Sequence, residues 1–211
     1  EALGRFDGPL NMARVQFAEG DLDGATESLR RAAEMDPPPP SWTHGWLSGI
    51  VNRQQGNLQA AAESLRAVLQ TKVPDRGFDF SLDYAVRNAL GLTLVDLAQR
   101  AEVMGDKAGF EEIVQDAIQQ FNQVLDVDSE NVTAHANLAE IYGLIGDTEQ
   151  EQYHRTLHTR YKPDDNAAEV AIPAARRRYP AANHAAEALV IYDMQRTEVA
   201  TDAEPDVTAA D

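Results

Sequence analysis

Apolar residues recur along the chain with the period of an α-helix, in paired stretches separated by a glycine turn. The turns occupy residues 18–22, 54–58 and 144–147, where Gly20, Gly56 and Gly146 are each followed by Asp or Asn. A Gly-Asp or Gly-Asn step between two helical stretches is typical of the turn in a helical hairpin. Its recurrence along one chain predicts a stack of such hairpins.

The first hairpin covers residues 10–37. Its small residues Ala13 and Ala25 lie where two helices of one hairpin approach closely, and Leu29 continues the apolar stripe. With the closing Pro37, this stretch resembles a tetratricopeptide repeat from end to end. Such a resemblance implies an all-α fold, a right-handed superhelical solenoid that binds other proteins.

Further copies extend the solenoid to about four hairpins over residues 6–163. The second copy covers residues 42–74 and the last covers residues 132–163, where Glu151 and His158 replace the family's alanines. Those two departures indicate a looser or terminal hairpin.

The third repeat, about residues 83–128, is enlarged. We expect its first helix to extend through Met104, a turn at residues 105–109, and its second helix at residues 110–125. Residues 164–196 are expected to form a C-terminal helix and an extended cap segment. The acidic residues 197–211, interrupted by Pro205, are expected to be disordered.

Composition and net charge exclude some kinds of site and disfavour some kinds of partner. The chain has 211 residues, and no apolar run is long enough to span a bilayer. Cysteine is absent, which excludes disulfides and thiolate ligands. With 18 Lys and Arg against 35 Asp and Glu, the net charge of −17 disfavours nucleic acid and anionic lipid as partners.

No catalytic residues are predicted, because the sequence contains neither a Gly-x-Ser-x-Gly elbow nor a glycine-rich phosphate loop. His154 and His158 lie four residues apart on a predicted helix and could face one metal ion or haem edge, with His184 as a further candidate ligand. Spacing fixes no third ligand. We therefore expect no metal site and no cofactor in this chain, with packing or solvated histidines as the favoured alternative.

The first helices of stacked hairpins line a groove. Aromatic and aliphatic side chains flanked by arginine suit an extended or helical segment of another protein. For Phe17 and Ile50, packing between repeats is an equal alternative. The repeat register places these residues toward the groove: Leu10, Arg14, Phe17, Trp46, Ile50, Arg53, Asn88, Leu92, Asp96 and Glu140.

Five further segments are similar to the repeat region associated with bacterial multihaem c-type cytochromes. They cover residues 37–42, 76–81, 131–135, 158–166 and 183–193. The similarity implies a non-catalytic periplasmic or extracellular module that is part of, or partner to, an electron-transfer assembly. No Cys-x-x-Cys-His is present, so haem c would belong to the parent protein or the partner.

Two alternatives stay open: a general cytoplasmic scaffold, and a metal- or haem-handling protein that uses His154, His158 and His184. The oligomeric state is not predicted. The chain begins at Glu1 without an initiator methionine, so we expect a processed protein or a piece of a larger one.

Overall fold

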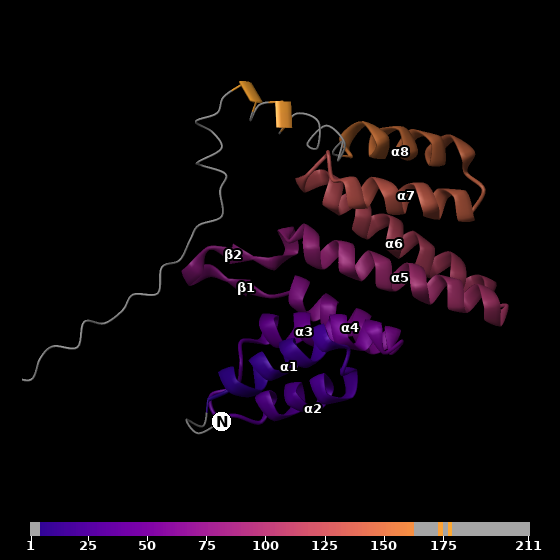
Figure 1. The fold of residues 1–211 in the computed structure, drawn as a ribbon. Coiled ribbons are helices and arrows are strands. Elements are labelled where there is room, and N and C mark those ends of the chain that lie inside the picture. Colours follow the sequence, from indigo (N-terminus) through magenta and orange to yellow (C-terminus); the bar gives the residue numbers. More distant parts are fainter. Residues whose placement is uncertain (1–4, 163–172, 175–176, 179–211) are drawn as a thin grey trace, which may run out of the picture. The chain divides into compact units, whose positions relative to one another are not determined.

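The computed structural model describes residues 5–162, 173–174 and 177–178. The chain divides into two units between Lys162 and Pro163, and each is described by itself. In the described part of the first unit, eight α-helices pair into four hairpins in chain order, from indigo α1 to orange α8 (Figure 1). The predicted all-α helical repeat fold is confirmed. No described helix is long and apolar enough to cross a membrane.

The four hairpins follow one another through direct helix contacts. Within each hairpin the two helices pack together, and the second helix then packs on the first helix of the next hairpin. The first helices α1, α3, α5 and α7 also contact one another in that order. The hairpins are α1 Asp7–Glu19 with α2 Leu22–Ala33, α3 Ser41–Gln54 with α4 Leu58–Leu69, α5 Tyr84–Met104 with α6 Lys107–Val127, and α7 Val132–Leu144 with α8 Thr148–Tyr161.

All four hairpin turns use the same local device. The glycine that ends the first helix adopts a left-handed conformation, which side chains other than glycine rarely tolerate. The φ angles are 83°, 79°, 76° and 80° at Gly20, Gly56, Gly105 and Gly146. In three turns the next residue is an aspartate whose carboxylate accepts an N–H bond in the first turn of the second helix. These caps are Asp21, Asp106 and Asp147.

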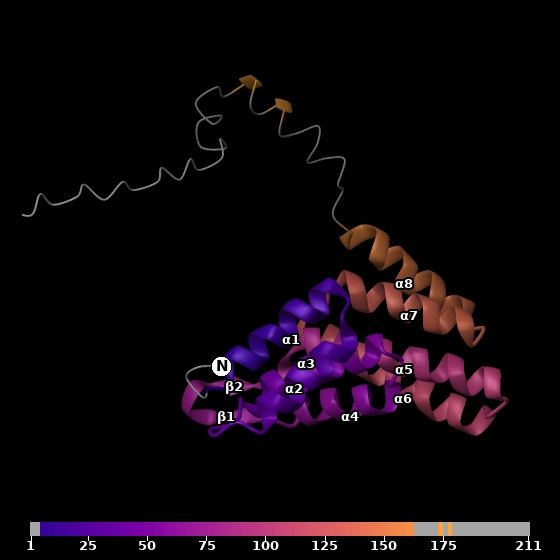
Figure 2. The ribbon, with the colours of Figure 1, turned by 60° about the horizontal axis from the view of Figure 1, so that its bottom comes forward.

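The third hairpin is the longest, with 21 residues in each helix. Its first helix ends at Met104, as expected. The second begins at Lys107, three residues before the expected start, because Asp106 caps it by accepting the Gly109 N–H at 3.0 Å. The turn end of α5 and α6 extends beyond the ends of α3 and α4 in both views (Figures 1 and 2).

A short β-hairpin lies between α4 and α5, where the sequence predicted no strand. β1 Lys72–Val73 pairs antiparallel with β2 Phe78–Asp79 around the 3₁₀ turn Pro74–Arg76. A second 3₁₀ turn, Phe80–Leu82, leads into α5. Lys72 closes the hairpin with an ion pair to Asp79 at 2.7 Å.

The core depends on small residues at the helix contacts. Ala25, Ala61 and Ala117 are almost completely buried, which lets the helices of each hairpin approach closely. In the enlarged hairpin, the fully buried ring of Phe121 lies directly on Gly91. A Cβ at that glycine would lie 2.5 Å from Cζ of Phe121, so no larger residue fits without displacement.

The described part of the second unit is limited to residues 173–174 and 177–178, which are helical. These fall within residues 164–196, where a C-terminal helix and an extended cap segment are expected. The rest of that stretch, which includes His184, and the tail at residues 197–211 lie outside the described residues.

Candidate protein-binding groove

A cleft of about 270 Å³ opens where α1, α3, α5 and the segment after β2 come together. Two aromatic rings form one wall: Trp42 stacks on Phe80 with ring centroids 5.7 Å apart. The buried side chains form two core clusters, one from α1, α2 and α3 and the other from α4 to α7, and half-buried Trp46 packs against both. The lining residues are Arg14, Trp42, Thr43, Trp46, Val68, Phe80, Asp83, Ala85 and Val86.

Two charged side chains, Arg14 and Asp83, line this aromatic cleft, and only Asp83 has hydrogen-bond partners among the described residues. The Asp83 carboxylate accepts the N–H groups of Ala85 and Val86 at 2.9 and 3.1 Å, which caps α5. Arg14 is exposed on α1 and has no ion pair or hydrogen bond within the described part of the chain. Its guanidinium is therefore the charge that a ligand could pair with.

Arg53 lies further along the row of first helices. Its Nε and Nη2 atoms both lie 2.9 Å from Oδ2 of Asp96, which joins α3 to α5. Both side chains are partly exposed. The structure thus brings two predicted groove residues together, but it pairs them with each other.

Other predicted groove residues take different positions. Leu10 is buried in the core between the first two hairpins, so it cannot contact a ligand and the prediction for it is wrong. Phe17 and Ile50 are half-buried against the same core, which is the packing alternative. Leu92 packs against the other core cluster. Glu140 is exposed on α7.

Asn88 is also buried, contrary to its predicted role in the groove. Its amide nitrogen donates to Oδ1 of Asn131 at 3.3 Å, so it links α5 to the start of α7. Its Oδ1 has no partner among the described residues.

Sequence reasoning missed the aromatic wall of the cleft. It assigns Trp42 to the second hairpin, and it notes Phe80 only within residues 76–81, one of the segments similar to the repeat region associated with multihaem cytochromes. The alternation of Phe78, Asp79 and Phe80 after Gly77 covers three residues, too few for a strand pattern to stand out, so no sequence signal places the Phe80 ring beside Trp42.

The histidines form an internal pair. Nδ1 of buried His154 lies 2.9 Å from Nδ1 of His135 on α7. Nε2 of His135 lies 3.1 Å from the Ser129 carbonyl oxygen. A carbonyl only accepts, so that Nε2 carries the proton, and Nδ1 of His135 accepts from N–H of His154.

Aromatic rings stack on both histidines of the pair. Tyr142 stacks on His154 at 5.6 Å, and Tyr161 stacks on His135 at 5.8 Å. Burial, followed by the nearby His135, lowers the pKa of His154 to about 4. His154 is therefore neutral at neutral pH.

The ring nitrogens of His158 and His154 bond to different groups and do not face one common ligand. Its Nδ1 donates to the Val132 carbonyl oxygen at 3.1 Å. Among the described residues, no three histidine, aspartate or glutamate side chains are grouped so that they could hold a metal ion. The metal- or haem-handling alternative stays a prediction, because its third histidine, His184, lies outside the described residues.

The turns, the alanine contacts and the row of first helices are the features of a known repeat. Residues 10–76 match the tetratricopeptide repeat family. The match covers the first two hairpins and the start of the β-hairpin. No curated protein sequence matches the chain.

Solved structures extend the likeness over most of the chain. Human IFIT1 solved with PPP-AAAA aligns with a TM-score of 0.59 at 15% identity, over 74% of this chain and 33% of that chain. A monomeric IFIT1 mutant solved with m7Gppp-AAAA aligns at 0.62 and 15% identity, over 87% and 39%. The chain thus spans well under half the length of the IFIT1 chains.

A bacterial structure matches in length as well. The tetratricopeptide repeat protein TTC0263 of Thermus thermophilus aligns with a TM-score of 0.58 at 16% identity, over 86% of this chain and 89% of that chain. At identities this low, the structural likeness shows a common helical repeat fold and says nothing about ligands.

Proposed function

We propose that the chain is a non-catalytic scaffold that binds a segment of another protein along α1, α3 and α5, with the aromatic cleft as its anchor. The observation that carries this proposal is the guanidinium of Arg14, unpaired among the described residues, beside the rings of Trp42, Trp46 and Phe80. Tryptophan and arginine in a partly desolvated pocket are the residues that dominate binding energy at protein interfaces.

The chemistry of the cleft defines the segment that fits it. Its wall takes an aromatic or large aliphatic side chain, and its volume of about 270 Å³ holds one such group. Arg14 then pairs with a carboxylate one or two residues away on the same segment. The ligand is therefore an apolar residue next to Asp, Glu or a chain terminus.

A nucleic-acid ligand fits less well. Human IFIT1 was solved with PPP-AAAA, but this chain has a net charge of −17, and Arg14 is the single cation among the described residues that line the cleft. Phosphate binding needs several cations close together to offset repulsion of that size.

The test uses the chain's own fluorescence. Both of its tryptophans, Trp42 and Trp46, line the cleft, so a ligand that enters it changes the tryptophan emission. Peptides selected from an array of acidic-aromatic sequences are titrated into the full chain. We expect Arg14→Glu to weaken binding by about tenfold or more, since it replaces attraction with repulsion.

The matched control is Arg160→Glu, on exposed α8. It makes the same charge change far along the chain from the cleft and should leave the affinity nearly unchanged. Trp46→Ala is a poorer test, because Trp46 also packs against both core clusters and its loss would destabilise the fold. Equal weakening by both arginine variants would show non-specific electrostatics and would overturn the proposal.

The partner proposed for the first test is a multihaem cytochrome in a periplasmic or extracellular assembly. This step rests on the resemblance of residues 183–193, and neither on the repeat architecture alone nor on the cleft. Co-purification from the native host followed by haem staining tests it. A preparation that retains other partners but no haem-stained band would leave the scaffold function standing and remove the cytochrome.

A further inference from the structure

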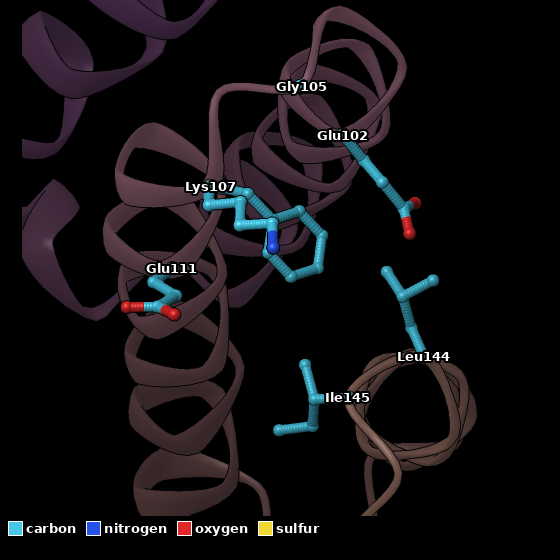
Figure 3. A pocket seen from close by; sticks show the side chains of 7 residues that line it. Glu102, Gly105, Lys107, Glu111, Leu144 and Ile145 are labelled. Carbon is cyan, nitrogen blue, oxygen red and sulfur yellow. The ribbon is translucent and has the colours of Figure 1, made fainter.

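A second cleft, of about 460 Å³, lies at the turn end of the enlarged hairpin, against the end of α7. Figure 3 shows Leu144 and Ile145 facing Glu102 and Lys107 across it, with Glu111 on α6 at another edge. Gly105 and Phe110 complete the lining. None of these residues lines the aromatic cleft, so the two sites are separate.

Apolar side chains at this end are unusually exposed. Val103 is 87% exposed, Met104 is 78% exposed, and Leu144 and Ile145 are each 40% exposed. The cause is a difference in length: α5 and α6 have 21 residues, whereas the covering helix α7 has 13. Apolar side chains gathered at one exposed end are typical of a protein-interaction site.

The charges at this end have one predominant sign. Residues 102–112 and 144–149 contain six carboxylates and a single cation, Lys107. Two of the carboxylates, Asp106 and Asp147, cap helices. The other four, Glu102, Glu111, Glu112 and Glu149, are exposed and form no ion pair with another described residue, and two of them, Glu102 and Glu111, line the cleft itself.

We infer that this end docks a cationic amphipathic segment of another protein, whose apolar side chains enter the cleft while its Lys or Arg residues pair with the surrounding glutamates. Such a segment satisfies both features at once, burying the exposed apolar surface and neutralising the carboxylates. A second copy of this chain fits less well, because it would bring the same carboxylates together between two molecules that each carry −17.

The test uses a labelled synthetic peptide of about 14 residues made of Leu and Lys with helical spacing, long enough to form a helix on a surface. It is titrated into the full chain at physiological ionic strength, and fluorescence anisotropy reports binding. Ile145→Asp should weaken the complex by about tenfold or more, because it places a carboxylate on the apolar floor.

Val127→Asp is the matched control. Like Ile145, Val127 is an exposed β-branched residue at the C-terminal end of a helix, and it lies at the other end of α6. It adds the same charge to the chain and should not weaken the peptide. Circular dichroism of both variants verifies the fold. Equal affinity for the two variants would mean diffuse attraction to an acidic surface and would overturn the inference.

A photoreactive group on an apolar side of the same peptide locates the contact directly. Cross-links within residues 102–111 and 144–147 support the inference, whereas cross-links at Arg14 or Trp46 place the peptide in the other groove and overturn it. Sedimentation of the free chain tests the second-copy alternative. A dimer that Ile145→Asp dissociates and Val127→Asp preserves would replace the proposed partner with another copy of the chain.

Discussion

The Nδ1 atoms of His135 and His154 lie 2.9 Å apart inside the last hairpin and share one hydrogen-bonding proton. The tautomer is fixed from one side, because Nε2–H of His135 donates to the Ser129 carbonyl. His154 is the single buried residue of α8. The attachment of α8 to α7 therefore depends on a titratable group.

The first prediction is that the last hairpin loses stability in mild acid. Folding lowers the pKa of His154 from 6.5 to about 4, so the unfolded chain takes up the proton more readily between these values. The contribution of the pair is complete above about pH 6.5 and is lost as the pH falls toward about 4. Urea midpoints measured across this window should decrease with decreasing pH.

The control for this prediction replaces the titratable imidazole of His154 with a neutral side chain of similar size. His154→Gln should be less stable at neutral pH, because the pair is broken, but its urea midpoint should depend less on pH between about 6.5 and 4. An unchanged slope in His154→Gln would show that other groups cause the acid sensitivity.

The second prediction concerns the alanine contacts. Ala25 has no exposed surface and lies where α1 meets α2, so Ala25→Glu buries an unpaired carboxylate and should cost about 3 kcal/mol or more. Glu27→Ala, two residues away, removes an exposed, solvent-screened ion pair to Arg30 and should cost far less than Ala25→Glu. Thermal melting of both variants checks this. Equal melting temperatures for Ala25→Glu and the parent would contradict the observed register.

The third prediction compares two glycines in equivalent first helices. Gly91→Ala forces a Cβ to within 2.5 Å of the fully buried Phe121 ring and should destabilise the chain by about 1–3 kcal/mol. Gly143→Ala meets only the carboxylate end of Glu151, at 3.2 Å, and gains helix propensity. It should be close to neutral. Chemical denaturation distinguishes the two, and an equal loss for both would mean that glycine acts here through backbone flexibility.

The sequence was sufficient for features that depend on neighbouring residues. A glycine followed by aspartate ends one helix and caps the next within a few residues, so Gly20 and Asp21 could be identified without the structure. The same step at Gly105 and Asp106 closes the enlarged hairpin. These features are local, and the sequence specified them well.

Features that depend on contacts between distant helices were not recoverable. Leu10 occupies a groove position by register, yet the neighbouring hairpin covers it. His135 and His154 are 19 residues apart, and only the crossing of α7 and α8 brings their rings together. The strands of the β-hairpin have two residues each, which is too short for an alternating pattern to stand out.

The fourth prediction concerns the ion pair that holds Arg53 away from a ligand. Asp96 binds both Nε and Nη2 of Arg53, and both side chains are partly exposed, so the pair should contribute only about 0–1 kcal/mol to stability. Asp96→Asn should therefore unfold much like the parent. It also frees the guanidinium of Arg53 to bind a ligand along the first helices, in addition to that of Arg14.

An acidic-aromatic peptide that changes tryptophan emission in the parent should bind Asp96→Asn more tightly, and the gain should shrink as salt is added. Glu130→Gln controls for the change in net charge, since Glu130 is exposed in the loop before α7. Replacing Arg53 with Gln in the Asp96→Asn background should cancel the gain. If the affinity of Asp96→Asn equals that of the parent while Arg14→Glu still binds weakly, the bound segment ends before it reaches Arg53.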